Sequence, residues 1–342
     1  MIQDAIRKLV DGGTLSEAEA AAATEDIMTG EATPAQIGAF LIALRLNGET
    51  VDEIAGMAKV MREKALRVAG DGELLDVVGT GGDGMRTFNV STASAFVAAS
   101  AGVKVAKHGN RAASGSVGAA DILEAYGVKL ELAPESVRQC IDEAGIGFMF
   151  APAFHPAMRF AGPARRELGV RTVFNFLGPL TNPAGAAYQL LGVAQPRDAS
   201  YDVAEAMAHV LASLGTRRSW VVRGGDGLDE LTTTTTSDVW EVSGGAVSRF
   251  TLAPEDAGLP RAQLSDLQID GSEQAREKFA RALSSGESPE KDIVLLNAGA
   301  ALVVSGKAED VAAGVKLARE TIDSGAPLEK VRSLAALSQT LA

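Results

Sequence analysis

The sequence feature that most constrains the fold is a glycine-rich stretch, residues 79–84, that follows the short apolar run Leu74–Val78. Four of these six residues are glycine. A simple strand-to-helix turn needs one glycine, whereas successive glycines permit positive φ angles and let backbone N–H groups approach a bulky anion. An alanine-rich helix is expected over Ser91–Ala101, and its N-terminus adds partial positive charge. The stretch predicts an anion-binding loop at the carboxyl end of a strand, with a purely structural turn as the alternative.

A second loop of the same kind follows. The run Val103–Ala106 predicts a strand, residues 107–116 read K-H-G-N-R-A-A-S-G-S, and a helix is expected over Ser116–Tyr126. Strand, helix, strand and helix at this spacing predict a parallel sheet with right-handed crossovers. Two polar loops at the ends of adjacent parallel strands face one crevice, which suits a ligand with two separate phosphate groups. The first loop, G-T-G-G-D-G, lacks the spacing of the dinucleotide fingerprint, and no Gly-Lys-Ser/Thr of a Walker loop follows it.

The N-terminal part has a different pattern. Residues 1 to about 67 predict four helices, because Ser16 with Glu19, Thr33 with Gln36, and Thr50 with Glu53 each fit a capping box. The predicted fold class is α/β, with a small all-helical N-terminal domain (1–70) and a larger α/β domain (71–342) built on a central, mostly parallel sheet. The segment 157–183 interrupts the strand–helix alternation and is expected to join the helical domain in space.

Later elements are expected from apolar runs and helical spacing. The expected strands are Gly147–Phe150, Tyr188–Val193, Ser219–Val222, Val239–Val242 and Asp292–Leu296, and the expected helices are Ser200–Leu214 and Ser272–Ser284. Five threonines at 232–236 are β-prone and are compatible with an edge strand.

The composition excludes several classes of protein. With 32 basic and 44 acidic residues the net charge is −12, which disfavours general nucleic-acid binding, because a phosphate backbone requires a broad basic surface. Cys140 is the only cysteine, so an intrachain disulfide and a thiolate metal cluster are excluded. The N-terminus, MIQDAIRKLVDGG, lacks the apolar core of a secretory signal, and the apolar run after residue 92 is too short to span a bilayer. We expect a cytoplasmic protein without a membrane segment.

Charged residues outside the two loops supply further candidates. A highly phosphorylated ligand usually brings Mg²⁺, and the adjacent carboxylates Asp229 and Glu230 follow an expected strand, although paired acids on a loop are also common on a solvated surface. Asp83 is a further candidate. Residues 155–183 contain Arg165, Arg166 and Arg171 among apolar residues. An arginine there could bind a substrate carboxylate with two hydrogen bonds, or form an ion pair with an acidic side chain of the protein. The spacing of the arginines does not distinguish these two roles.

Five motifs in order resemble the anthranilate phosphoribosyltransferase family. They are G-T-G-G-D at 79–83, N-V-S-T at 89–92, K-H-G-N-R at 107–111, R-R-E-L-G-V-R-T-x-F-N-x-L-G-P-L-x-N-P at 165–183, and D-E at 229–230. The resemblance covers almost the whole chain. It implies the nucleoside phosphorylase and phosphoribosyltransferase-like fold of glycosyltransferase family 3, a homodimer, and the tryptophan-biosynthesis reaction of anthranilate with 5-phosphoribosyl 1-diphosphate.

The resemblance also implies roles for individual residues. His108 and Arg165 would serve the chemistry, with His108 expected to orient the substrate, and Gly79, Asn110 and Arg165 would contact anthranilate. Ser91, Asp229 and Glu230 would bind Mg²⁺. The phosphoribosyl diphosphate would be held by Gly79, Gly82, Asp83, Thr87, Asn89, Val90, Ser91, Thr92, Lys107, His108, Gly109, Asn110, Arg111, Ala112, Ala113, Ser114, Gly115 and Ala119.

Two other readings stay open. A pyrimidine nucleoside phosphorylase has similar architecture, but its phosphate loop reads K-x-S-x-G-G-V-G-D, unlike the G-T-G-G-D-G of this chain. A non-catalytic relative that binds nucleic acid belongs to another class, and the acidic balance and the Asp229–Glu230 pair argue against it.

Overall fold

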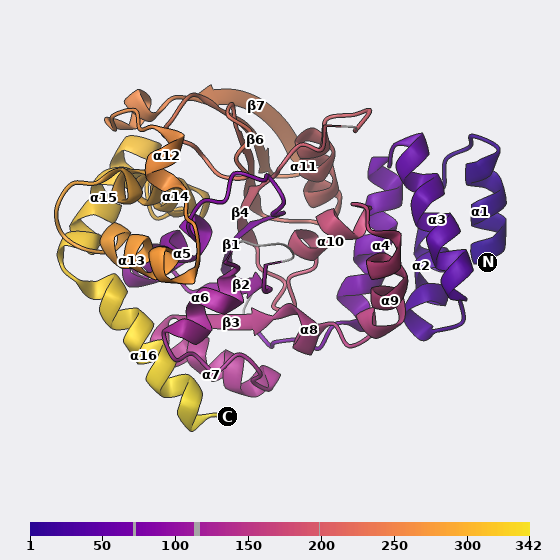
Figure 1. Cartoon of the computed structure of the whole chain (residues 1–342), viewed down its shortest axis with the longest axis horizontal. Helices are drawn as coiled ribbons and strands as arrows, with labels where there is room; N and C mark the ends of the chain where they lie inside the picture. The colour runs from indigo at the N-terminus through magenta and orange to yellow at the C-terminus, as the bar shows by residue number, and fades with distance from the viewer. Residues whose placement is uncertain (71–72, 113–116, 198) are drawn as a thin grey trace.

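The computed structural model describes residues 1–70, 73–112, 117–197 and 199–342. A helical bundle lies at one end of the molecule and a sheet covered by helices forms the rest (Figure 1). The helices are α1 Ile2–Val10, α2 Glu17–Thr29, α3 Pro34–Asn47, α4 Val51–Lys64, α5 Val90–Ser100, α6 Ala119–Ala125, α7 Pro134–Ala144, α8 Ala151–Phe154, α9 Met158–Leu168, α10 Phe174–Leu180, α11 Val203–Ser213, α12 Leu264–Leu267, α13 Ser272–Ala282, α14 Pro289–Val304, α15 Val311–Asp323 and α16 Ala326–Thr340. The strands are β1 Leu75–Gly79, β2 Val105–Gly109, β3 Ile146–Phe150, β4 Tyr188–Gly192, β5 Arg218–Gly224, β6 Ser237–Ser243 and β7 Ala246–Leu252.

The seven strands form one sheet in the order β3-β2-β1-β4-β5-β6-β7. The strands from β3 to β5 are parallel, and β6 and β7 are antiparallel additions at one edge. The chain builds outward from β1 in one direction through β2 and β3, then returns to add β4 and β5 on the other side of β1. Such a reversal leaves a crevice at the carboxyl ends of the two central strands, where open α/β sheets bind ligands. The predicted α/β class with a mostly parallel sheet is confirmed.

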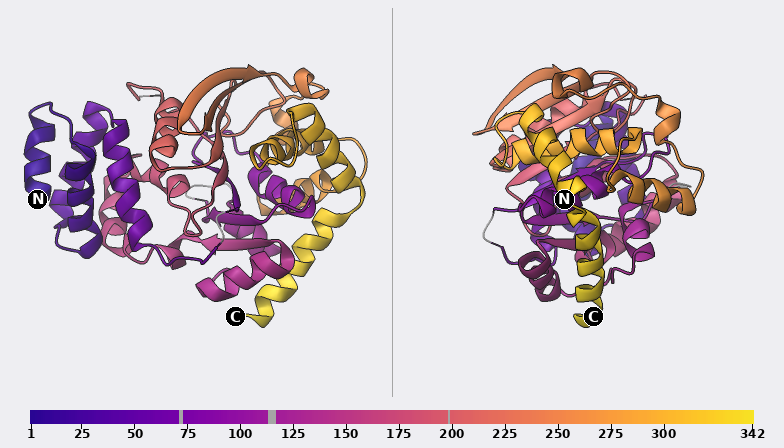
Figure 2. Two further views of the ribbon diagram at one scale, coloured as in Figure 1. Left: turned by 180° about the vertical axis from the view of Figure 1, so that it is seen from behind. Right: turned by 90° about the vertical axis from the view of Figure 1, so that its left-hand side faces the viewer.

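Two apolar cores lie on the two faces of the sheet. One core holds α5 and α14 against the inner strands, with α13, α15 and α16 outside them. The other core holds α11 and continues from the sheet into the helical bundle. Seen from behind, the bundle lies at one end of the molecule and α16 lies toward the other end (Figure 2, left). In the described part of the chain, no helix has the combined length and apolarity that crossing a bilayer requires.

The three predicted capping boxes are confirmed. The side chains of Ser16, Thr33 and Thr50 each accept a hydrogen bond from the backbone N–H three residues later. The Glu or Gln side chain at that later position accepts the backbone N–H of the cap residue. Within the bundle, α9 packs against α2 and α3, and α10 packs against α4, so residues from 158 to 180 lie with the N-terminal helices. The boundary drawn at residue 70 stays a prediction.

Several sequence-based elements were wrong or shifted. The expected strand Asp292–Leu296 lies inside α14, which begins after Ser288 as its cap and is buried nearly all round; a continuous apolar run does not distinguish a buried helix from a buried strand. The expected strand Val103–Ala106 is β2, two residues further on. The threonine run at 232–236 is a loop, not an edge strand, because Thr232 and Thr234 donate their hydroxyls to Asp226.

Other elements were not predicted. The hairpin from β6 to β7 turns through Gly244 and Gly245, whose φ angles are 57° and 81°. A Gly-Gly pair between two β-prone runs is a hairpin signal that was available in the sequence. Helices α7, α15 and α16 were also missed, whereas α11 and α13 lie within the expected ranges.

Candidate functional site

The glycine-rich loop leaves the carboxyl end of β1 in an unusual backbone conformation. Gly81, Gly82 and Gly84 have φ angles of 69°, 75° and 76°, a region that favours glycine. Arg86 has a φ angle of 56° and is the one non-glycine residue with positive φ in the described part of the chain. Such conformations cost energy and gather at ligand-binding loops, where the surrounding structure holds them. The loop is therefore built for close backbone approach.

The carboxylates of Asp229 and Glu230 reach this loop from the segment between β5 and β6. Asp229 Oδ2 accepts the N–H of Gly81 at 2.6 Å, and Glu230 Oε1 accepts the N–H of Ser91 at 3.1 Å, in the first turn of α5. A Cβ on Gly79 would lie 2.4 Å from Asp229 Oδ2, so the absence of a side chain there permits the contact. The structure thus brings the segment after β5 against two nearby parts of the first loop region, the turn after β1 and the start of α5.

The two carboxylates hold a concentrated negative charge. Both residues keep some exposed surface, but their carboxylates lie among protein atoms. Burial, followed by the nearby Asp83, raises the pKa of Asp229 to about 7. Burial, followed by Asp229, raises the pKa of Glu230 well above its usual value, and Lys107 opposes that shift. Carboxylates that resist ionisation in this way are suited to a cation that neutralises them.

The donor set fits Mg²⁺ in particular. Mg²⁺ prefers oxygen ligands and is commonly held by one or two carboxylates while substrate phosphates and water supply the rest. Asp229 and Glu230 supply the carboxylates, and Ser91, whose backbone N–H contacts Glu230, carries a hydroxyl. Among the described residues, no group of three or more His, Cys, Asp or Glu is arranged to hold a metal by itself. A site that needs the substrate to complete the metal's coordination agrees with both observations.

The other predicted residues of the first loop divide by environment. Asp83 Oδ1 accepts the N–H of Met85 at 3.0 Å, and Thr87 forms an isolated bridge with Gln268. Helix α5 begins at Val90, one residue earlier than expected. Asn89 is its N-cap residue, but the Asn89 side chain makes no capping hydrogen bond and its amide donates to Val117 O at 2.7 Å. Val90 is a core residue. Thr92 is fully buried, and its hydroxyl has no hydrogen-bond partner among the described residues.

The shift of β2 corrects the second predicted loop. Lys107, His108 and Gly109 lie inside the strand, and the loop begins only at Asn110. Lys107 is 2% exposed and donates to Val77 O at 2.5 Å. Burial lowers the pKa of Lys107, while Asp76 and Glu230 counteract that shift. The Lys107 amine therefore lies buried within the sheet, against the backbone of β1.

The remaining residues of the second loop lie next to α6. Asn110 Oδ1 accepts the N–H of Arg111 at 2.7 Å. The guanidinium of Arg111 donates to Asp121 at 3.0 Å and to Glu124 at 2.7 Å, so it is directed toward α6. The N–H of Ala112 also donates to Asp121, and Ala119 is the first residue of α6. Ala113, Ser114 and Gly115 lie outside the described residues.

His108, on β2, faces His155, which follows α8, and both side chains are buried. The ring centroids are 5.1 Å apart, and in each ring Nε2 has no hydrogen-bond partner among the described residues. Burial is the main cause that lowers the pKa of His108 to about 3 and that of His155 to about 4. Both imidazoles are therefore neutral at pH 7. His155 was not predicted as a site residue, and no spacing pattern in the sequence marked it.

Arg165 is half-buried on α9. Its guanidinium lies 5.1 Å from the centre of the Phe174 ring, and burial lowers its pKa. Among the described residues no carboxylate pairs with Arg165, so the ion pair considered from the sequence is not formed there. A half-buried guanidinium on an aromatic face is a suitable partner for a planar carboxylate.

Two further residues support the loops: Arg171, one of the three arginines singled out in 155–183, and Asn297, which the sequence analysis did not single out. The guanidinium of Arg171 donates to the carbonyls of Gly82 and Gly81 at 2.8 and 3.2 Å. Asn297, on α14, is fully buried. Its Oδ1 accepts the N–H of Leu231 at 3.0 Å, and its Nδ2 donates to the carbonyl of Leu231 at 2.8 Å. Asn297 was detectable as a lone amide in an apolar helix.

An open hollow of about 610 Å³ is lined by residues that include Tyr201, Arg223 and Asp238. Arg223 is already paired with Asp202 at 3.0 Å and with Asp238 at 3.4 Å. Gly224, Gly225 and Gly227 line part of the hollow, but Asp229 and Glu230 do not line it. We therefore place the candidate site at the ends of β1, β2 and β5 and not in this hollow.

Comparisons with known proteins agree with the fold and with the motifs. Residues 71–328 match the family model "Glycosyl transferase family, a/b domain", and residues 3–65 match its "helical bundle domain". The chain is 54% identical over 341 residues to the anthranilate phosphoribosyltransferase of Chloroflexus aurantiacus, covering 99% of both chains. It is 48% identical over 344 residues to that of Dehalococcoides mccartyi, covering 100% of this chain and 99% of the relative.

Solved structures show the same likeness. The chain resembles the crystal structure of anthranilate phosphoribosyltransferase from Thermus thermophilus with a TM-score of 0.91 and 46% identity, covering 98% of this chain and 99% of that one. It resembles the Saccharomyces cerevisiae enzyme in complex with PRPP and Mg with a TM-score of 0.89 and 28% identity, covering 99% and 98% of the two chains.

Proposed function

This chain belongs to the anthranilate phosphoribosyltransferase family, and we propose that it transfers the phosphoribosyl group of phosphoribosyl diphosphate (PRPP) to the amine of anthranilate. The products are N-(5-phosphoribosyl)anthranilate and diphosphate, in tryptophan biosynthesis. One observation carries the proposal most directly. Asp229 and Glu230 contact the glycine-rich loop and the first turn of α5, so metal-binding carboxylates and anion-binding backbone meet at one point. A site of this kind is suited to a ligand with several phosphates.

The donor is proposed to bind across the two loops. The N–H groups of the glycine-rich loop and the N-terminus of α5 would hold the diphosphate, and Lys107 beneath them would offset its charge. Asp83, Thr87, Asn89, Thr92 and the loop from Asn110 to Gly115 would supply the other contacts, as the family motifs imply. Ser91, Asp229 and Glu230 are proposed to hold Mg²⁺, which would neutralise the charge that grows on the diphosphate as it leaves.

The acceptor is proposed to bind between the loops and the helical bundle. The guanidinium of Arg165 would pair with the carboxylate of anthranilate, with Gly79 and Asn110 beside the ring. The aromatic amine is already a neutral nucleophile at pH 7, so no strong base is needed to activate it. His108 is neutral at that pH because burial lowers its pKa to about 3, and we assign it to orienting the substrate.

The reaction then depends mainly on departure of the diphosphate. Backbone donors fixed in place stabilise a developing anion without reorganising during the reaction. As the bond to diphosphate breaks, the ribosyl carbon gains oxocarbenium character, and the amine attacks from the opposite face. This explains why the site is rich in anion-binding groups. The protein is proposed to act as a homodimer in the cytoplasm, which light scattering and cell fractionation would test.

The test follows anthranilate consumption through its own fluorescence in the presence of PRPP and Mg²⁺, and repeats it after EDTA. Loss of fluorescence that requires both PRPP and Mg²⁺ is the expected result. Folded protein that leaves anthranilate untouched would overturn the acceptor assignment. A parallel assay with pyrimidine nucleosides and phosphate would then show whether the phosphate site serves a phosphorylase reaction.

A further inference from the structure

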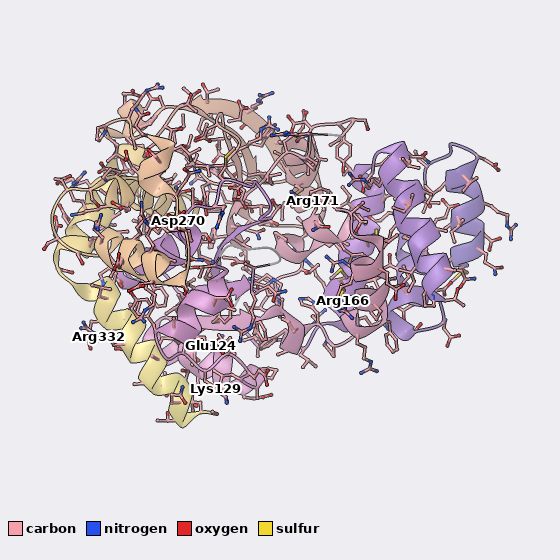
Figure 3. The ribbon with its side chains drawn as sticks, in the orientation of Figure 1. Glu124, Lys129, Arg166, Arg171, Asp270 and Arg332 are labelled. Atoms are coloured by element: carbon pink, nitrogen blue, oxygen red, sulfur yellow. The ribbon has the colours of Figure 1, made fainter. Side chains whose placement is uncertain are left out.

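The segment that joins α9 to α10 contains an arginine that the reaction scheme above does not use. Arg171 lies where the helical bundle meets the sheet-containing part, and Arg166 lies on α9 (Figure 3). From that position, Arg171 Nη1 donates to Gly82 O at 2.8 Å and Nη2 donates to Gly81 O at 3.2 Å. One guanidinium therefore holds two consecutive carbonyls of the glycine-rich loop, across about 90 residues of sequence.

Arg171 is held in place on both sides. Its own carbonyl accepts a hydrogen bond from Arg45 of α3, and its guanidinium lies 5.8 Å from the centre of the Phe176 ring. The next residues form a closed turn, in which the N–H of Thr172 donates to Asn175 Oδ1 at 2.9 Å and the N–H of Asn175 donates to Thr172 O at 2.8 Å. The guanidinium thus extends from a fixed support on the helical bundle.

The two carbonyl contacts determine where the neighbouring N–H groups point. In a trans peptide the carbonyl and the following N–H lie on opposite sides of the bond. Holding the carbonyls of Gly81 and Gly82 toward Arg171 therefore turns the N–H groups of Gly82 and Asp83 away from it. Neither N–H donates to another described residue, whereas the preceding N–H, that of Gly81, is bonded to Asp229. Two successive open N–H groups on a glycine-rich turn form an anion-binding concavity.

The same contact explains part of the glycine pattern. A Cβ on Gly82 would lie 2.6 Å from Arg171 Nη1 and 3.0 Å from its Cζ. Gly82 also has a positive φ angle of 75°. This glycine therefore meets two requirements, the turn of the loop and the close approach of the guanidinium.

We propose that Arg171 is a positioning residue for the donor, which holds the glycine-rich loop so that the N–H groups of Gly82 and Asp83 face the diphosphate. The inference rests on the proposed function for the identity of the donor. Arg171 touches the loop and not the reacting atoms, so its loss weakens donor binding more than acceptor binding. Because α9 carries Arg165 six residues earlier, one segment of chain supports both substrates.

The experiment compares wild type with Arg171→Ala, Arg171→Lys and Arg166→Ala. Arg166 is an exposed arginine in α9, five residues before Arg171, and serves as the matched control. Calorimetry measures binding of inorganic diphosphate with Mg²⁺, and steady-state kinetics gives KM for PRPP and for anthranilate. Arg171→Ala is expected to weaken diphosphate binding and raise KM for PRPP about tenfold, since hydrogen bonds from charged donors stabilise by amounts of this order. For Arg171→Lys, diphosphate affinity and KM for PRPP are expected to lie between those of wild type and Arg171→Ala, because an ammonium group does not donate to two carbonyls in the geometry of a guanidinium.

Unchanged diphosphate binding in folded Arg171→Ala would overturn the inference. An equal rise in both KM values, or the same effect in Arg166→Ala, would assign Arg171 a general structural role instead. If Arg171→Ala does not fold, Arg171→Lys keeps the charge and decides the question. Wild type that binds diphosphate but leaves anthranilate unchanged would overturn the acceptor assignment and leave the positioning role testable by calorimetry.

Discussion

The contact between Gly192 and Asp229 gives the sharpest prediction about how the carboxylates are placed. Gly192 ends β4 and pairs in register with Gly79 at the end of β1. A Cβ added to Gly192 would lie 1.6 Å from the backbone carbonyl oxygen of Asp229 and 2.4 Å from its carbonyl carbon. Real Cβ atoms essentially never come closer than 3.0 Å to such atoms, so the Asp229 backbone would have to move by about 1.4 Å.

We expect Gly192→Ala to lower both activity and stability. The obstructing atoms belong to the backbone, which does not rotate away, and overpacking of this kind costs about 1–3 kcal/mol. A displacement of about 1 Å at a group that positions substrate lowers turnover roughly 100-fold. Gly79→Ala should be milder for stability, because its Cβ meets the Asp229 carboxylate at 2.4 Å, and a side chain can turn aside.

The assay measures kcat, the Mg²⁺ concentration for half-maximal rate, and thermal unfolding for both variants and wild type. Gly271→Ala is the matched control, since a Cβ there meets nothing within 4 Å and the backbone is extended. A Gly192→Ala protein with wild-type turnover and an unchanged Mg²⁺ requirement would refute the reasoning. It would show that the carboxylates do not depend on the close approach of β4 to the metal-binding segment.

Three further predictions concern side chains. In metal-free protein, burial raises the pKa of Asp229 from 3.8 to about 7, so the folded state favours the protonated carboxyl. The free energy of unfolding therefore falls as pH rises from about 4 toward 7. Unfolding temperatures measured across pH 4–8 should show wild type losing stability relative to Asp229→Asn. His108→Ala should lower kcat less than the double change Asp229→Ala and Glu230→Ala, measured at saturating substrates. Asn297→Ala should destabilise the fold by about 2 kcal/mol, measured by denaturant unfolding, and should raise the Mg²⁺ requirement, because it leaves the buried backbone of Leu231 unpaired.

Each of these has a clear contrary result. Saturating Mg²⁺ should abolish the pH-dependent difference between wild type and Asp229→Asn, and a difference that persists would assign the effect to another group. A loss in His108→Ala as large as that of the double variant would give His108 an essential proton transfer. Wild-type Mg²⁺ affinity in folded Asn297→Ala would show that Leu231 does not set the position of the carboxylates.

The sequence predicts the fold class well because its local signals agree. Caps, glycine positions and apolar runs all indicate a helical unit followed by strands and helices in alternation, and the sheet and the three capping boxes confirm it. The errors arise where polar residues are buried, or where a helix is apolar on all sides. β2 was placed too early because Lys107 and His108 are polar, yet both are buried within the strand. The residues from Asp292 to Leu296 show no helical periodicity of apolar residues, because α14 is buried on almost every side, and they were therefore predicted as a strand.

The candidate site divides in the same way. The loops and the carboxylate pair are recognisable because each is a local run of unusual composition. The roles of Arg165 and Arg171 were not separable from spacing, because the turn closed by Thr172 and Asn175 determines which arginine faces the loop. Long-range supports of this kind depend on tertiary packing and leave no local pattern in the sequence.

The helical bundle has a consequence for how the chain folds during synthesis. The core around α1 to α4 also includes Ala161 and Ala164 of α9 and Phe174 and Leu177 of α10. Helix α4 ends at residue 64 and α10 at residue 180, so at ribosomal rates of about 5–20 residues per second the first four helices wait on the order of 10 s for these partners. During that interval they expose the apolar faces that α9 and α10 later cover. The nascent N-terminal segment is thus exposed to aggregation until residue 180 has been made, although its sequence pattern is that of an independent unit.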